Sequence, residues 1–177
     1  MKKLFKPYLT AFLLGALMIS TTACSDDDDP APIEEEENIT SMTLTLEPVS
    51  TNKGATTANA TFTAGSTPTL QLAPNTQYNA TITFNDNIED EIRDEAEDHE
   101  VFFNTAENLL VVQKIMPDDF DSNGRPVGLM TRMITGNAGE SGTLTVTLKH
   151  QPGLKDANSD ISVGETDVEA TFTVSIQ

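Results

Sequence analysis

Two histidines, His99 and His150, are the only imidazole side chains in this chain of 177 residues. Glu95 precedes His99 by four residues, a spacing that places the two side chains one turn apart on the same face of a helix. An imidazole and a carboxylate at this spacing can hold Zn²⁺ or another divalent ion. His150 ends an alternating run from Leu144 to Leu148, so it continues the inward face of a strand to its rim. If the histidines converge, Glu95, His99 and His150 form a zinc site.

Further carboxylates lie close to His150 in the sequence, in the loop that leads to the last strand. Asp160, Glu165 and Asp167 could add ligands there, and a solvated acidic loop explains them equally well. The histidines also have an alternative, because a rim histidine is more often a hydrogen-bonded structural residue than a ligand. Zinc binding is therefore one of two hypotheses for this group.

A second candidate ion site lies in the stretch "DDFDSNG" from Asp118 to Gly124. Asp119, Asp121 and Asn123 match the opening of a calcium loop, Asp-x-Asp-x-Asn-Gly. Met130 stands where the closing glutamate of an EF-hand would be, so that loop is incomplete. Asn-Gly is also a strong hairpin signal, and a turn is the favoured interpretation. Calcium is therefore a less favoured ligand of this protein than zinc.

Composition and motifs favour a binding protein over an enzyme. The chain has no Gly-x-Ser-x-Gly elbow and no phosphate-binding glycine loop, and its one cysteine lies near the N-terminus. It contains 28 acidic residues against 10 basic ones, a formal net charge of −18. Such a charge repels nucleic acids and anionic lipid headgroups, so neither is an expected partner. We expect a monomer that is not an enzyme.

The elements that must position these residues are mostly strands. Five segments alternate between apolar and polar residues with period two, as half-buried antiparallel strands do: 41–47, 57–63, 77–84, 142–150 and 167–176. Weaker candidates are 69–72, 108–115 and 126–134. The continuous apolar run 109–112 indicates a strand covered on both faces. Seven to nine strands at this spacing predict an antiparallel immunoglobulin-like β-sandwich.

One segment departs from the strand pattern. From Ile88 to His99, Ile88, Ile92, Ala96 and His99 share one helical face and acidic residues fill most other positions. The pattern predicts one short acidic amphipathic helix across an end or edge of the sandwich.

The stretch "LQLAPNTQYNATITF" from Leu70 to Phe84 carries the spacing Leu-x-Pro-x-Thr-x-Tyr. It resembles the tyrosine corner of fibronectin type III and related immunoglobulin-like domains. There the tyrosine hydroxyl bonds to upstream backbone and joins the two sheets. The resemblance assigns this structural role to Tyr78.

The N-terminus has the layout of a secretory signal, with three lysines followed by the apolar run Ala11 to Ile19. The run is shorter than the roughly 20 residues of a membrane-spanning helix. Small residues then precede Cys24, although Thr21 stands where a lipobox usually has leucine. We expect a signal peptide at 1–23, a lipidated Cys24 opening an acidic disordered tether at 24–37, and the β-domain at 38–177. The alternative is an ordinary signal-peptidase cut after Ala23.

Several stretches together resemble a set of small uncharacterised Bacteroidota surface lipoproteins, among them "CSDDDD", "LAPNTQYNATITF", "EIRDEAEDHEVFF" and "GETDVEATFTVSIQ". Such chains are often labelled type 1 periplasmic binding fold proteins. That fold consists of βαβ units, which do not occur here, so the β-sandwich remains our prediction. The resemblance implies a lipid anchor in the outer membrane, with the domain facing the exterior.

These observations lead to two functional hypotheses. In the first, the domain captures a divalent metal, zinc, for a neighbouring outer-membrane transporter of the TonB-dependent type. In the second, it is a structural or adhesive surface protein that binds a protein or a glycan.

Overall fold

The computed structural model describes residues 38–49 and 54–177. The expected signal peptide, the lipidated Cys24 and the acidic tether lie outside these residues. Within them the segments with clean alternation are strands, because successive side chains of a strand point to opposite faces of a sheet. In β1 (Ser41–Pro48), Met42, Leu44 and Leu46 are fully buried while the threonines between them face outward.

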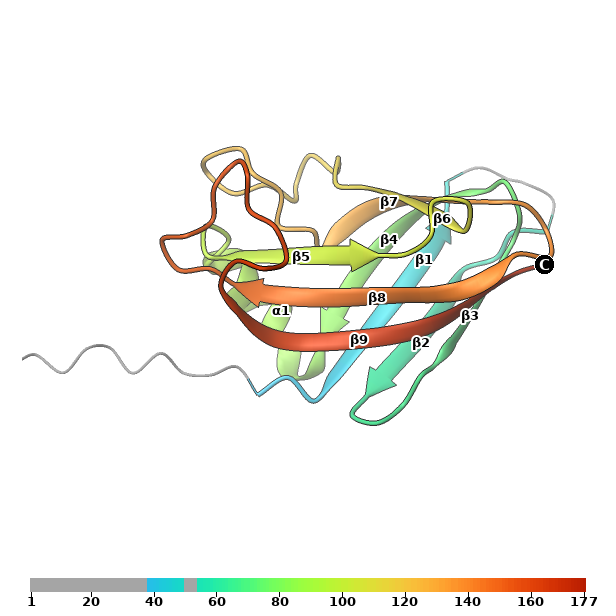
Figure 1. Cartoon of the computed structure of the whole chain (residues 1–177), viewed down its shortest axis with the longest axis horizontal. Coiled ribbons are helices and arrows are strands. Elements are labelled where there is room, and N and C mark those ends of the chain that lie inside the picture. Colours follow the sequence, from blue (N-terminus) through green and yellow to red (C-terminus); the bar gives the residue numbers. More distant parts are fainter. Residues whose placement is uncertain (1–37, 50–53) are drawn as a thin grey trace, which may run out of the picture. The chain divides into compact units, whose positions relative to one another are not determined.

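Two sheets make up the described part of the chain, and Figure 1 shows them as the layers of a β-sandwich. The first has the order β2-β1-β4-β7-β6 and adds β2 (Ala58–Thr63), β4 (Gln77–Phe84), β6 (Leu110–Gln113) and β7 (Met130–Thr135) to β1. The second has the order β3-β9-β8-β5, with β3 (Thr69–Leu72), β5 (His99–Asn104), β8 (Ser141–His150) and β9 (Glu165–Ile176). The predicted immunoglobulin-like β-sandwich with one short helix is confirmed. One strand pair differs from an all-antiparallel arrangement, since β3 runs parallel to β9.

The core lies between the inner faces of the two sheets. Its largest fully buried side chains come from both layers and include Tyr78, Phe172, Met42, Leu44, Leu70, Leu72 and Ile82. The outer faces carry threonine instead, and cross-strand threonine pairs such as Thr43 with Thr61 hydrogen-bond there. This division between faces determines the register, because a shift of one residue would expose an entire inner face.

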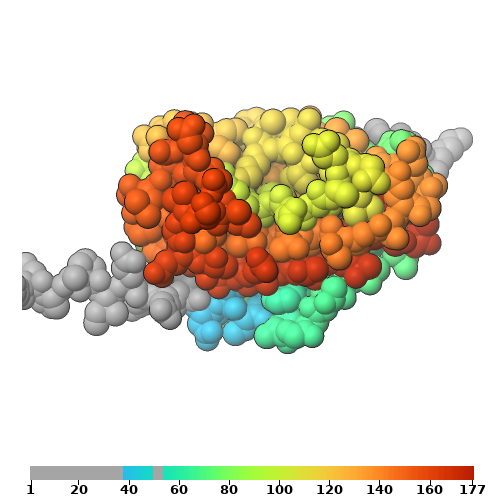
Figure 2. Space-filling model, viewed as in Figure 1, coloured from blue at the N-terminus to red at the C-terminus, as the bar shows by residue number. Residues whose placement is uncertain are grey.

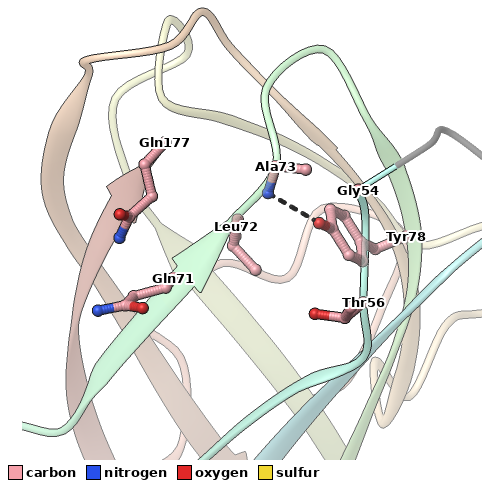
Figure 3. A pocket seen from close by; sticks show the side chains of 7 residues that line it. All are labelled: Gly54, Thr56, Gln71, Leu72, Ala73, Tyr78 and Gln177. Atoms are coloured by element: carbon pink, nitrogen blue, oxygen red, sulfur yellow. Dashed lines mark hydrogen bonds between the residues drawn. The ribbon is translucent and has the colours of Figure 1, made fainter.

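The tyrosine corner is present. The hydroxyl oxygen of Tyr78 accepts a hydrogen bond of 2.9 Å from the backbone N–H of Ala73, as the dashed line in Figure 3 shows. Tyr78 belongs to β4 in the first sheet, and Ala73 directly follows β3 in the second. The contact therefore joins the two layers at this end of the sandwich.

The helix is shorter than its sequence pattern indicates. Helix α1 (Ile88–Asp94) has seven residues, and a turn from Glu95 to Asp98 leads into β5. Ile88 and Ile92 are buried as expected, but His99 is the first residue of a strand. Acidic residues at the carboxyl end of a helix oppose its dipole, and the continuation of this helix would place three there. The prediction of a helix extending to His99 was wrong.

Two strands at one side of the sandwich also differ from expectation. The sequence pattern did not identify β5, whose residues pair with β8 from His99 to Asn104. β6 is the edge strand of its sheet, and Val111 is 42% exposed. The expectation that residues 109–112 are covered on both faces is therefore wrong for β6, although Leu109 and Leu110 are buried.

Candidate metal centre

One end of the sandwich gathers the residues that could bind an ion. Helix α1 ends there, β5 and β9 begin there, and β8 ends there (Figure 1). The helix brings Glu95 at its C-cap, β5 brings His99, and β8 brings His150. Residues from three elements, up to 55 positions apart in the sequence (from Glu95 to His150), thus meet at this end.

His99 and His150 are partners in the antiparallel ladder of β5 and β8, and both continue the inner face on which Val101 pairs with Leu148. Their rings are stacked, with centroids 4.6 Å apart and an angle of 6° between the planes. His99 is 1% exposed and His150 is partly buried. The sequence left open whether the two histidines converge, and in the structure they do.

Glu95 approaches His99 through two different groups. Its backbone carbonyl oxygen lies 3.2 Å from Nδ1 of His99 and its carboxylate oxygen Oε2 lies 4.0 Å from the same nitrogen. One ligand atom from each of Glu95, His99 and His150 lies within 4.8 Å of the others. Three groups that commonly bind zinc therefore converge, and the Glu95 side chain remains 58% exposed.

Asp167 is a fourth group at this centre. Its Oδ2 lies 3.9 Å from Nε2 of His99, and its side chain is 16% exposed. The sequence pattern does not distinguish Asp167 from Asp160 and Glu165 in the same acidic segment, but in the structure those two residues are exposed. Asp167 differs from them because the pairing register of β8 and β9 shifts between Leu148 and Lys149. The residue types in the sequence do not predict such a bulge.

Burial affects the protonation of both His99 and Asp167. Desolvation lowers the pKa of His99, against the hydrogen bond to the Glu95 carbonyl, so the ring is neutral at pH 7. Burial raises the pKa of Asp167 to about 6, although the nearby His150 and Lys149 oppose this shift. A neutral imidazole is the form that binds a metal, so His99 requires no proton loss before it can coordinate.

The turn that carries Glu95 is held by the loop between β8 and β9. Gln151 donates its backbone N–H to the carbonyl of Asp98 at 2.5 Å, and Lys155 donates through Nζ to the carbonyl of Ala96 at 2.7 Å. This loop, residues 151–164, projects in orange and red at one end of the surface in Figure 2. Both contacts keep the Glu95 turn beside the histidine pair.

His99 and His150 can bind the same zinc ion only after a small rearrangement of their rings. Two ligand atoms on one zinc ion lie at most about 4.2 Å apart, because each Zn–N bond is about 2.0–2.1 Å long. In addition, the in-plane lone pairs of two parallel stacked rings do not meet at one point. Since His99 is fully buried, the partly buried His150 is the ring that has to turn out of the stack.

The residues of the candidate calcium loop make internal contacts. Oδ1 of Asp121 accepts the backbone N–H groups of Asn123 and Arg125, and its Oδ2 lies 3.1 Å from Nζ of Lys155. Oδ2 of Asp119 accepts the backbone N–H of Gly128. The favoured turn is present, with Gly124 at a φ of 75° and its N–H bonded to the carbonyl of Asp121. Calcium binding there stays a prediction.

Two hollows occur elsewhere on the described surface, and neither contains a histidine. One of about 140 Å³ lies at the tyrosine corner, between Gln71, Tyr78 and Gln177 (Figure 3). The other, about 410 Å³, lies between the end of β5 and the edge strand β6 and includes Val111. The histidine centre is thus separate from both.

Comparisons with known proteins add no relative. The chain matches no protein-family model, no curated protein and no solved structure. The resemblance to surface lipoproteins stays a prediction. Across the residues that the structure describes, no helix is both long enough and apolar enough to span a membrane.

Proposed function

We propose that this protein is a lipid-anchored binding module on the outer face of the outer membrane. Its domain captures a divalent metal ion, zinc, and passes it to a neighbouring transporter of the TonB-dependent type. The observation that carries the metal-binding proposal is the convergence of His99 and His150 with carboxylates at one end of the sandwich. The surface location and the anchor at Cys24 rest on the sequence of residues 1–37.

The donor set suits zinc better than calcium or magnesium. Imidazole nitrogen is a preferred ligand of Zn²⁺, whereas Ca²⁺ and Mg²⁺ take oxygen ligands almost exclusively. A neutral His99 and a partly buried His150 supply two nitrogens, and a carboxylate supplies an oxygen. Three protein ligands leave one position of a tetrahedral ion open, and an open position allows a ligand of the acceptor to attack during transfer.

Isothermal titration calorimetry of the purified chain with zinc tests the metal-binding function. Cys24→Ser removes the one thiol, so zinc binding by that residue does not contribute. We expect micromolar or tighter affinity, and its loss when His99→Ala and His150→Ala are combined. Affinity weaker than micromolar, or unchanged in the double variant, would contradict metal capture. Either result would favour the other hypothesis, in which the domain binds a protein or a glycan.

A further inference from the structure

The two ring nitrogens of His99 face different groups. Nδ1 lies 3.2 Å from the backbone carbonyl oxygen of Glu95, and Nε2 lies 3.9 Å from Oδ2 of Asp167. A carbonyl oxygen can only accept a hydrogen bond, so Nδ1 carries the proton and Nε2 of the neutral ring holds the lone pair. Histidine ligands commonly donate their second N–H to a backbone carbonyl in this way. A metal ion on His99 therefore binds at Nε2.

The carboxylate of Glu95 is on the wrong side of the ring for such an ion. Its Oε2 is 4.0 Å from Nδ1, and the two imidazole nitrogens direct their in-plane bonds to different edges of the ring. The Glu95 side chain is also 58% exposed, so holding it at an ion costs side-chain entropy. In this arrangement Glu95 orients His99 through its backbone.

The carboxylate of Asp167 is on the side of Nε2. Leu148 pairs with Val168 and the next residue, Lys149, pairs with Thr166, so Asp167 is an extra residue in β9. A bulge of this kind redirects a side chain, and here Asp167 reaches His99. The Oδ2 atom of Asp167 is buried and has no hydrogen-bond partner among the described residues. A buried polar atom without a partner is rare in a folded protein and requires an explanation.

We propose that Asp167, and not Glu95, is the carboxylate ligand of the zinc site, together with Nε2 of His99 and one nitrogen of His150. This assignment rests on the proposed metal-binding function. His150 pairs across the ladder with Glu165, two residues before Asp167. The separation of 3.9 Å between Nε2 and Oδ2 is within the roughly 4.2 Å that two ligands of one zinc ion can span.

The test compares Asp167→Asn with Glu95→Gln in the full chain that carries Cys24→Ser. Each change removes one negative charge at nearly constant volume, and Glu165→Gln is a third, exposed control for charge alone. By zinc calorimetry we expect affinity to fall roughly tenfold or more in Asp167→Asn and to stay within about twofold in the other two. Far-UV circular dichroism and thermal unfolding in chelator establish that each variant is folded.

The outcomes separate the two proposals. If the parent chain does not bind zinc, both fail. If it binds zinc and Asp167→Asn retains full affinity, or Glu95→Gln loses as much, only the assignment of Asp167 fails. NMR of the imidazole nitrogens gives a readout independent of affinity: with zinc bound, Nδ1 of His99 should keep its proton and the Nε2 resonance should shift. Loss of the Nδ1 proton would overturn the assignment.

Discussion

Lys155 and Asp121 form a fully buried ion pair, with Nζ 3.1 Å from Oδ2 and no exposed side-chain surface on either residue. The same Nζ donates to the carbonyl of Ala96, next to Glu95. Three segments that are remote in sequence thereby meet at one ammonium group: the turn after α1, the loop around residue 121 and the loop after β8. The ion pair connects the candidate metal centre to the rest of this end of the sandwich.

Removal of this cation should strongly destabilise the fold. Lys155→Met leaves the Asp121 carboxylate buried without its cation, and breaking a buried pair in this way costs about 3–5 kcal/mol. Urea unfolding followed by circular dichroism measures the loss. The double variant with Asp121→Asn removes the uncompensated charge and should recover part of that stability. A double variant no more stable than Lys155→Met would contradict the explanation.

The pH dependence of stability should show the contribution of Asp121. Burial alone would raise the pKa of this carboxyl, but hydrogen bonds from Arg125, Lys155 and Asn123 outweigh it and lower the pKa below its ordinary 3.8. A carboxyl group with a lowered folded-state pKa stabilises the protein fully at pH values above its ordinary 3.8. This stabilisation is lost as the pH falls from 3.8 through the lower folded-state pKa. We expect unfolding in acid to show this loss, and Asp121→Asn to reduce it. If Asp121→Asn loses as much stability in acid as the parent does, Asp121 does not cause this loss.

Asp167→Asn should stabilise the protein in the presence of a chelator, although it weakens zinc binding. Burial raises the pKa of Asp167 to about 6, so its contribution to stability is complete below pH 3.8 and is lost as the pH rises through about 6. At about pH 8 the parent therefore carries a buried charge that asparagine lacks.

Thermal unfolding in chelator at several pH values measures this effect. The Tm of Asp167→Asn should exceed that of the parent at about pH 8, and the difference should disappear toward about pH 4. About 1 kcal/mol corresponds to roughly 2–4 °C in a domain of this size. A variant less stable than the parent at about pH 8 would make Asp167 a structural residue.

Gly164 should tolerate no side chain, because it lies against the backbone of His150. A Cβ added there would collide with the His150 carbonyl oxygen, and its φ of 74° adds strain. Gly153→Ala is the matched control, since its φ is 64° but the space around it is open. We expect Gly153→Ala to cost about 1–2 kcal/mol from strain alone and Gly164→Ala to cost more. Only Gly164→Ala should weaken zinc binding, and equal effects of both on affinity would contradict this.

The tyrosine corner should contribute to stability and not to metal binding. Tyr78→Phe leaves the backbone N–H of Ala73 without its acceptor, which costs about 1–3 kcal/mol when the group is buried. The corner lies at the start of β4, whereas α1 and Glu95 follow the end of β4. Chemical unfolding should show the loss, and zinc calorimetry should show no change. Weaker zinc binding in Tyr78→Phe would mean that the two ends are coupled.

The sequence allowed most of the fold to be predicted, because most of the strands were encoded locally. The alternation of apolar residues and threonine marks β1, β4, β8 and β9 directly, since each buries one face. The end of α1 and the start of β5 were not predictable in this way. In that stretch Glu95 to His99 fits a helical pattern, and only the pairing of His99 with His150 makes it a turn and a strand.

In the candidate site, the position of His150 was predictable, whereas the element that carries His99 and the arrangement of the site were not. His150 continues an inward-facing run, so its position at the rim follows from strand periodicity. The stacking of the rings depends on the register between β5 and β8, which no local pattern contains. The role of Asp167 depends on a bulge, and its neighbours Glu165 and Thr166 are no less polar.

The bulge in β9 has a consequence for how such a site can be gained or lost. Thr166 and Val168 are two positions apart on β9, but their ladder partners on β8, Lys149 and Leu148, are consecutive residues. Deleting Asp167 would therefore join two residues that are already in register and leave the sandwich unchanged. A single codon would separate a sheet with this carboxylate from one without it. Related chains could then carry the same histidine pair in two lengths of β9.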